Sequence, residues 1–562
     1  MIFLENIFFL RLKWMLILLA LFYRTDIKSQ SNTLIINEIM ANPSTSELPN
    51  YEYIELLNIG NKTINLLHYT LSISNTTIAL PEYLLSPNQY VLLCNQAAQP
   101  FYEKFGNSLA ISKWPALANS GTSVTLAGEN NIDQVNYTDS WYKNTTKKNG
   151  GWSLERINTN FPCNFALSWK ASEAPAGGTP CKPNSVADRS YVPEIEIISS
   201  KIESNTITLT FNIPKNYLEN LEKDLFMVDN NIGTPTKIEW KNDTDSLLLI
   251  FQSAFAESFD YTLTLSPFSW CGNNYSSEKK QYLFIQGDIA FNDVIINEIL
   301  FNPKNNGVDF VEIYNQSNNI INLQNWKLGN RTITTNRLLF NPQQYLVLTT
   351  DKNNILKNYP SALSENIVET TSLPPYPNEQ GNVTLFSDRI LVDSLYYSSN
   401  MHQSFLTNVK GISLERQSFY VPTNSPQNFV SASTLVGGAT PGYANSTNVD
   451  NFFQKNHVYL TTKTISPDND NFEDYLEIRY ELLTSNMMLN VTIFDDQGRQ
   501  INRLIRHQST SNSGKIQWDG TSENGQVAPS GFYIYHVETY DTKGNYEVYR
   551  GGFVLTHKSL SY

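Results

Sequence analysis

The sequence predicts an all-β protein built from tandem β-sandwiches joined by short linkers. First, 562 residues are too many for one hydrophobic core, so several domains are expected. Second, aromatic residues make up 12% of the chain and charged residues only 17%, a balance that favours strands and turns over helices. Third, one long stretch of the sequence occurs twice in the same order.

The repeat begins with IINEIMANP at Ile35–Pro43, which returns as IINEILFNP at Ile295–Pro303. Five further pairs of segments follow in the same order with nearly constant spacing: Asn50–Ser72 with Gly307–Gly329, Leu84–Leu93 with Leu339–Leu348, Ser123–Leu126 with Asn382–Leu385, Gly151–Arg156 with Gly411–Arg416, and Gly177–Ser185 with Gly437–Ser446. Within each copy, short segments with apolar residues at period two are separated by Asn, Gly and Pro turns, as in an all-β sandwich. A single helical turn is expected near Pro100–Phe105.

The rest of the chain gives two more β domains. Alternating segments such as TITLTF and YTLTL indicate a sandwich between the copies. Near the C-terminus, Asp495–Arg499 reads as a hairpin turn, with Gly498 able to take a positive φ, and GFYIYHVETY reads as a long strand. The predicted division of the chain is a signal peptide over 1–30, the first copy over 32–186, the middle domain over 193–288, the second copy over 292–448 and the C-terminal domain over 452–560.

The repeated motifs resemble the lamin-tail domain, an immunoglobulin-like sandwich of nuclear lamins and of many secreted bacterial proteins. The resemblance rests on the opening IxEIxxNP, on the I-N-L strand that follows and on the closing GTPxxxN. The middle domain resembles bacterial Ig-like domains. The C-terminal domain is similar to the FlgD-type Ig-like domain and to the sorting domains of the type IX secretion system of Bacteroidota. These resemblances imply export to the bacterial surface and no enzymatic activity.

The N-terminus has the layout of a secretory signal peptide. Arg11 and Lys13 precede the apolar run Trp14–Tyr23, and polar residues follow it. The run is shorter than the roughly 20 residues of a membrane span, although a signal anchor is the alternative because Ile2–Leu10 is also apolar. We expect a secreted or cell-surface protein with no transmembrane span in the mature chain. The net charge of −13 makes nucleic acid an unfavourable partner.

Two pairs of glutamates occupy the same places in the two copies: Glu38 with Glu298, and Glu55 with Glu312. Paired carboxylates at a suitable separation can hydrolyse glycosides. Duplication of an intact active site is unusual, however, and lamin-tail domains are not enzymes. We therefore interpret these glutamates as structural acceptors of backbone N–H groups or as partners of an arginine, such as Arg156 or Arg416.

The segment SPDNDNFED at Ser466–Asp474 is a candidate calcium site. Asp468, Asp470, Glu473 and Asp474 supply closely spaced carboxylate oxygens, the ligands that Ca²⁺ prefers. The full EF-hand pattern fails, because its sixth position is Glu473 instead of glycine. The alternative is a polar turn that leads into the next strand. No other cofactor is expected.

The four cysteines form no metal-binding pattern, and export permits disulfides. Cys163 and Cys181 are both absent from the second copy, which predicts that they pair with each other. Cys94 lies on a predicted strand and is expected to be a buried thiol. Cys271 is left either free or paired with Cys94.

No GxSxG, HExxH, GxGxxG or P-loop motif is present. Tryptophans such as Trp114, Trp141 and Trp152 have two interpretations, stacking on sugars or packing in the core, and we favour the core. The predicted function is that of a non-catalytic surface scaffold or adhesion protein that binds protein or glycan partners. The alternatives are an accessory subunit of a secreted nuclease or phosphoesterase system and an enzyme site built across domain junctions.

Overall fold

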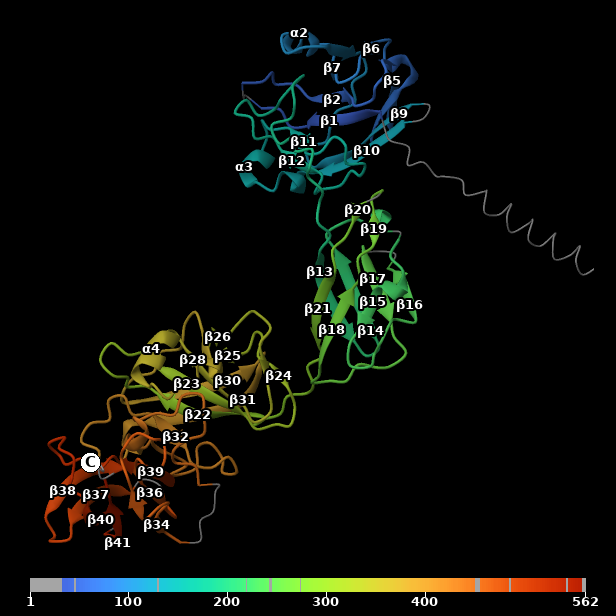
Figure 1. Cartoon of the computed structure of the whole chain (residues 1–562). Helices are drawn as coiled ribbons and strands as arrows, with labels where there is room; N and C mark the ends of the chain where they lie inside the picture. Colours follow the sequence, from blue (N-terminus) through green and yellow to red (C-terminus); the bar gives the residue numbers. More distant parts are fainter. Residues whose placement is uncertain are drawn as a thin grey trace, which may run out of the picture. The chain divides into compact units, whose positions relative to one another are not determined.

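The computed structural model describes residues 33–557 except 45–46, 129–130, 219, 242–244, 273, 450–454, 485–486 and 542–543. The predicted signal peptide over 1–30 lies outside the described residues. The chain divides into two compact units, one of residues up to 255 with 260–283, and one of 256–259 with 284 onward. Figure 1 shows the successive β-sandwiches in sequence colours, and the predicted all-β class is confirmed. Within the described part of the chain, no helix is both long and apolar enough to cross a membrane.

The first copy of the repeat consists of two packed sheets. The larger sheet has the order β12-β11-β1-β2-β7-β8, with β1 (Leu34–Met40), β2 (Tyr53–Asn58), β7 (Tyr90–Asn95), β8 (Ser108–Ile111), β11 (Leu154–Arg156) and β12 (Trp169–Ala171). The smaller sheet has the order β10-β9-β4-β5, with β4 (Thr70–Ile73), β5 (Thr76–Ala79), β9 (Gly121–Gly128) and β10 (Asn131–Thr138). The remaining elements are β3 (Ile64–Asn65), β6 (Leu84–Leu85), α2 (Gln99–Tyr102), α3 (Thr145–Lys148), η1 (Leu66–His68) and η2 (Asp139–Tyr142). The helical turn predicted near Pro100 is confirmed as α2.

A β-bulge in β1 determines which side chains enter the core. Leu34 and Ile36 point into the core between the sheets, and after the bulge between Ile36 and Glu38 the strand returns Ile39 to the same core. The extra residue places Asn37 and Glu38 together on the other face of the sheet, where both are buried. Strand β22 (Val294–Leu300) of the second copy has the same bulge, between Ile296 and Glu298.

The middle domain is a smaller sandwich of alternating strands. Its sheets have the orders β13-β14-β17-β16 and β15-β18-β21, and β19 pairs with β20. The elements are β13 (Ile197–Glu203), β14 (Thr206–Phe211), β15 (Phe226–Val228), β16 (Lys237–Trp240), β17 (Ser246–Ile250), β18 (Asp260–Leu265), β19 (Ser269–Trp270), β20 (Asn274–Tyr275), β21 (Lys279–Phe284), η3 (Lys215–Tyr217) and η4 (Lys223–Leu225). In β14 and β18 every second side chain is buried, as the alternating sequence predicts.

The second copy reproduces the two sheets of the first. The larger has the order β29-β28-β23-β22-β32-β33, with β23 (Phe310–Asn315), β28 (Tyr345–Thr349), β29 (Ile367–Glu369), β32 (Leu414–Arg416) and β33 (Phe429–Ser431). The smaller has the order β26-β25-β30-β31, with β25 (Lys327–Leu328), β26 (Arg331–Thr332), β30 (Gln380–Ser387) and β31 (Ile390–Ser398). The other elements are β24 (Ile321–Asn322), β27 (Leu339–Phe340), α4 (Lys352–Asn358), η5 (Ser364–Asn366), η6 (Ser399–Met401) and η7 (Thr434–Val436). The sequence did not predict α4, which begins after Asp351, whose carboxylate accepts the N–H of Asn354.

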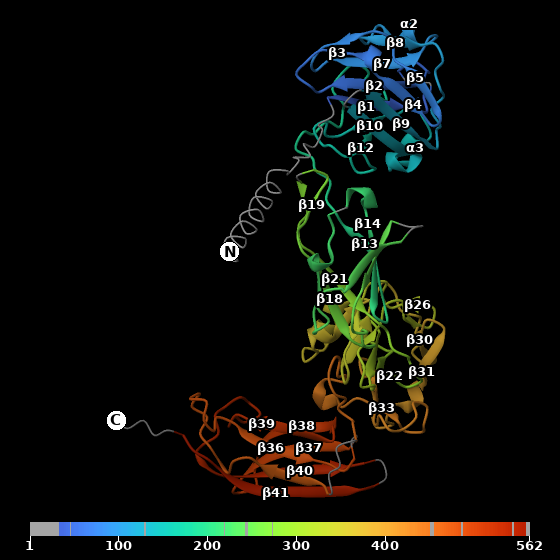
Figure 2. The ribbon, with the colours of Figure 1, turned by 90° about the vertical axis from the view of Figure 1, so that its right-hand side faces the viewer.

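The C-terminal domain is a sandwich of a three-stranded and a five-stranded sheet (Figure 2). Their orders are β34-β36-β39 and β35-β41-β40-β37-β38, with β34 (His457–Leu460), β35 (Thr464–Ile465), β36 (Leu476–Glu481), β37 (Met488–Asp495), β38 (Gln500–Ser509), β39 (Ser513–Trp518), β40 (Gly531–Tyr540) and β41 (Tyr546–Leu555). The predicted hairpin turn is confirmed, since the N–H of Asp495 donates to the carbonyl of Arg499 and Gly498 has a φ of 76°.

Candidate functional site

Each copy of the repeat contains three glutamates side by side on adjacent strands. In the first copy, Glu38 of β1 lies opposite Glu55 of β2 on one side and Glu155 of β11 on the other. In the second copy, Glu298 lies between Glu312 and Glu415 in the same way. We call each set a carboxylate triad, and all six side chains are fully buried. The sequence showed the third member of each triad only as part of the repeated LER motif.

The triads hold the closing segment of each copy against the sheet. In the first copy, Glu38 accepts the backbone N–H of Thr179 at 2.8 Å, and Glu55 accepts that of Cys181 at 2.5 Å. Glu155 accepts the N–H of Val186 at 3.2 Å. In the second copy the corresponding donors are Thr440, Gly442 and Thr447. The predicted role as acceptors of backbone N–H groups is therefore confirmed.

The alternative role considered for these glutamates, pairing with Arg156 or Arg416, does not apply, because both arginines pair with aspartates. Arg156 donates to both carboxylate oxygens of Asp133, at 3.0 and 2.8 Å. Arg416 pairs with Asp393 at 3.3 Å. The bulge explains the difference, because it turns Glu38 to the face of the sheet away from Arg156 and Asp133. The carboxylate of Asp133 also accepts the backbone N–H of Ile36 at 2.7 Å.

One threonine hydroxyl in each copy lies between two carboxylates. Thr179 Oγ1 is 3.2 Å from Glu38 Oε2 and 3.0 Å from Glu155 Oε1. Thr440 Oγ1 is 3.3 Å from Glu298 Oε2 and 2.8 Å from Glu415 Oε1. A hydroxyl has a single proton to donate, so only one of these contacts can use it. The other contact is a hydrogen bond only if the carboxyl group carries a proton.

The electrostatics of the triads agree with a retained proton. Burial, followed by the nearby charge of Glu155, raises the pKa of Glu38 to about 7. Burial and the charge of Glu415 raise the pKa of Glu298 to about 8. Burial also raises the pKa of Glu55 and of Glu312 well above the ordinary value. The triads are thus enclosed groups with raised pKa values, and they serve as structural clamps.

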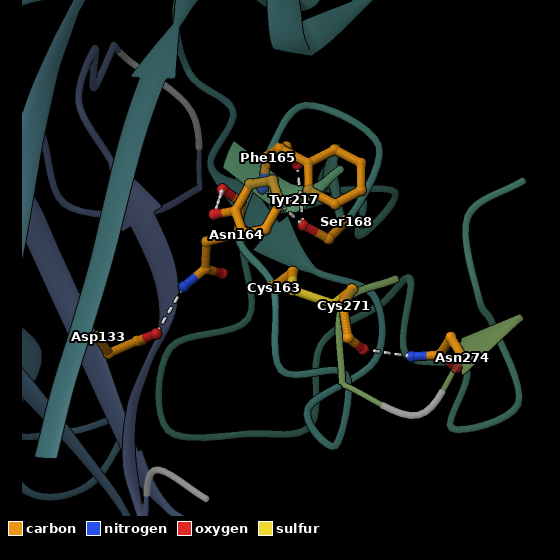
Figure 3. The surroundings of a disulfide bond; sticks show 8 residues. All are labelled: Asp133, Cys163, Asn164, Phe165, Ser168, Tyr217, Cys271 and Asn274. Atoms are coloured by element: carbon orange, nitrogen blue, oxygen red, sulfur yellow. Dashed lines mark hydrogen bonds between the residues drawn. A yellow bond between two sulfur atoms is a disulfide. The ribbon is translucent and has the colours of Figure 1, made fainter. Parts of the chain in front are cut away.

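A disulfide joins the first copy to the middle domain. Cys163 bonds to Cys271, with the Cα atoms 6.0 Å apart (Figure 3). The predicted pairing of Cys163 with Cys181 is therefore wrong, and so is the alternative bond between Cys271 and Cys94. Cys163 lies in the loop between β11 and β12, whereas the Cys181 sulfur lies 3.4 Å from the carbonyl of Asn107, beside β8 at the opposite edge of the sheet. Cys94 is a buried thiol, as predicted.

Aromatic side chains surround this disulfide. Trp270 of the middle domain lies 5.9 Å from Phe161 and 6.2 Å from Phe165 of the first copy, measured between ring centroids. The hydroxyl of Tyr217 donates to the carbonyl of Asn164 at 2.9 Å (Figure 3). The first copy and the middle domain are therefore joined by a covalent bond, a hydrogen bond and a buried aromatic cluster.

The structure brings together three of the four residues proposed for calcium. Carboxylate oxygens of Asp468, Asp470 and Asp474 lie within 4.8 Å of one another. Asp474 also accepts the backbone N–H groups of Asp468, Asn469 and Asn471, which closes the turn. Glu473 is not part of this cluster, because its carboxylate accepts the hydroxyl of Thr462 at 3.0 Å.

The three tryptophans considered for sugar stacking are all used within the first copy. Trp141 is buried in the core. Trp152 packs against the core, and the ammonium group of Lys147 lies 4.4 Å from its ring centroid. Trp114 donates its indole N–H to Glu52 at 2.9 Å. These contacts fit the core-packing interpretation.

Comparison with known families assigns the repeat. Residues 27–139 and 288–399 both match the family described as Lamin Tail Domain. The chain carries two lamin tail domains. Residues 459–555 match the CHU_C Type IX secretion signal domain. The first and second copies are therefore called the first and second lamin tail domains, and the C-terminal sandwich is a secretion signal domain. No curated protein matches the chain.

Solved structures give only weak global similarity. FlgD from P. aeruginosa is 22% identical over 18% of this chain and 72% of its own, with a TM-score of 0.14. The latent dimeric PorU from Porphyromonas gingivalis is 11% identical over 70% of this chain and 36% of its own, with a TM-score of 0.16. A tetra-tandem repeat of a large adhesion protein is 9% identical over 93% of this chain and 99% of its own, with a TM-score of 0.14. Values this low support no inference about activity.

Proposed function

We propose that this protein is a secreted, cell-surface scaffold that acts by binding protein or glycan partners and not by catalysis. The observation that carries the proposal is the type IX secretion signal domain, which follows two lamin tail domains on the same chain. Such a domain is a signal for export, so the remaining sandwiches are the exported part of the protein.

The buried carboxylates support a non-catalytic role. Burial raises the pKa of four triad members, Glu38, Glu55, Glu298 and Glu312, and perturbed acidic groups often mark active sites. Here each carboxylate is fully buried and accepts hydrogen bonds from the closing segment of its own domain. A substrate has no access to them, so their chemistry serves folding.

The disulfide between Cys163 and Cys271 supports location outside the cytoplasm. Disulfides persist in oxidising compartments and are rare in the reducing cytosol. This one fixes the first lamin tail domain to the middle domain. A fixed arrangement of two sandwiches presents a pre-organised surface, which lowers the entropic cost of binding a partner.

Cell fractionation with a C-terminal truncation tests the proposal. In the native host, the full-length chain should reach the cell surface, whereas a chain that ends before Asn451 should accumulate in the periplasm. A matched control is a full-length chain carrying Gln500→Ala, which changes an exposed side chain of the same domain. Unchanged surface display of the truncated chain would remove the main support for the proposal.

A further inference from the structure

The second lamin tail domain contains an open cavity of about 560 Å³. Its lining includes Gly307, Val308 and Asp309 on the segment that leads into β23, and Leu373 and Pro374 on the segment that leads into β30. All of these residues belong to one domain. None of the triad glutamates lines the cavity, and neither the fold nor the secretion signal explains it.

The first lamin tail domain has larger side chains at the corresponding positions. The alignment of Glu55 with Glu312 places Asn50, Tyr51 and Glu52 opposite Gly307, Val308 and Asp309. The alignment of Val124 with Val383 places Trp114 opposite Leu373. All four differences replace a larger side chain by a smaller one in the second domain, and all four smaller residues line the cavity.

In the first domain the acidic residue at this position is satisfied internally. Glu52 Oε2 accepts the indole N–H of Trp114 at 2.9 Å and the backbone N–H of Leu117 at 3.0 Å. Trp114 also packs against the core of that domain. In the first domain, Trp114 thus occupies the position that corresponds to the cavity, and its indole N–H is the hydrogen-bond partner of Glu52.

In the second domain the acidic residue has no such donor. Among the described residues, none donates a hydrogen bond to the carboxylate of Asp309, and burial alone raises its pKa to about 6. The hydroxyl of Tyr376, the counterpart of Leu117, is buried and likewise has no partner in the described part of the chain. The nearby lysines do not compensate, because Lys304 donates to the carbonyl of Asn358 and Lys410 donates to the side chain of Asn305.

We propose that this cavity binds an aromatic side chain with a ring N–H, supplied by a protein partner, in the place that Trp114 fills in the first domain. The ring would bury its apolar faces against Val308, Leu373 and Pro374, and its N–H would donate to Asp309. A hydrogen bond from N–H to a carboxylate is stronger than one between neutral groups, and tryptophan anchors in pockets often dominate protein interfaces. The inference rests on the proposed binding function and names the chemistry of one partner.

Titration of the full-length protein with N-acetyltryptophanamide tests the inference, with ligand-observed NMR as the readout. We expect one saturable site. The 1-methylindole analogue, which lacks the N–H, should bind roughly 10- to 100-fold more weakly, as expected for the loss of one hydrogen bond to a charged group. Asp309→Asn should weaken binding of the N–H probe without changing that of the methylated probe.

The chain offers matched variants at Leu373 and Trp114. Leu373→Trp should fill the cavity, abolish binding and raise the melting temperature of the second domain, whereas Trp114→Leu should open a second site in the first domain and double the stoichiometry. If Trp114→Leu fails to fold, Leu373→Trp and Asp309→Asn still decide the outcome.

Three results would overturn the inference: no binding of the tryptophan probe at millimolar concentration, equal binding of the methylated probe, or binding that Leu373→Trp leaves unchanged. Displacement of the probe by a neutral saccharide, with tighter binding of the saccharide, would also overturn it and would assign the cavity to glycans. These failures differ from failure of the proposed function, because cell fractionation reports export whether or not the cavity is occupied.

Discussion

Replacement of Glu298 by glutamine tests whether the carboxylate triad retains a proton. The pKa of Glu298 rises from 4.5 to about 8 in the folded protein. The stabilisation from this bound proton is complete below pH 4.5 and disappears as the pH rises through 8. Linkage with these two values gives a loss of roughly 3 kcal/mol in the stability of the second domain between pH 6 and pH 9.

Glu298→Gln removes this titration and keeps the contacts. The amide nitrogen can donate to Thr440 Oγ1, and the amide oxygen can accept from the hydroxyl of Ser413 and the backbone N–H of Thr440. We therefore expect the variant to resemble the wild type at pH 6 and to be more stable at pH 9. Glu312 and Glu415, whose pKa values are also raised by burial, contribute to the remaining pH dependence.

Hydrogen exchange measured by mass spectrometry on peptides that cover residues 437–447 is the assay, because a four-domain chain does not unfold in one step. After correction for the intrinsic effect of pH on exchange, protection in the wild type should fall between pH 6 and pH 9, and in the variant it should fall less. Glu298→Ala is the control, since it leaves the donors unpaired and should lose about 1–3 kcal/mol at both pH values. Equal pH dependence in the wild type and Glu298→Gln would refute the retained proton.

Three other predictions follow from the described contacts. Replacement of Cys163 and Cys271 by serine should uncouple unfolding of the first lamin tail domain from that of the middle domain and lower the free energy of unfolding by at most about 4.7 kcal/mol. Calorimetry before and after reduction would show this effect, and identical thermograms would contradict it. Calcium should bind the cluster of Asp468, Asp470 and Asp474 and release heat that Asp470→Asn removes, whereas no heat up to millimolar Ca²⁺ would refute the site. Burial raises the pKa of the Cys181 thiol to about 12, so iodoacetamide at pH 8 should label it far more slowly in the folded protein than in urea, and equal rates would disprove that protection.

Local patterns in the sequence predicted the individual strands well. The alternating segments became β14, β18 and β40, and Gly498 turned the hairpin between β37 and β38. These features depend on neighbouring residues, since the period of two and the positive φ of glycine are local properties. The duplication added the correspondence of whole domains, because equivalent residues occupy equivalent positions in both copies.

Contacts between distant segments were harder to predict. The joint absence of Cys163 and Cys181 from the second copy suggested a bond within the repeat, but the partner of Cys163 lies in the middle domain, outside the repeat. The bulge at Glu38 was not predicted either. A bulge changes which face of the sheet the side chains of a strand occupy, and the residue types of the strand do not reveal it. As a result, the sequence left open whether the glutamates accept backbone N–H groups or pair with an arginine.

The bond between Cys163 and Cys271 also determines how the chain would carry a mechanical load. Tension applied between the two ends of the protein would pass directly from one sulfur to the other, and the segment between the two cysteines would stay slack. The two cysteines are 108 positions apart, so the bond withholds about 350 Å of extended chain from stretching. The linker between the first lamin tail domain and the middle domain lies inside that protected length. Under shear flow, this junction would behave as a short inextensible tether, and elongation would have to begin elsewhere in the molecule.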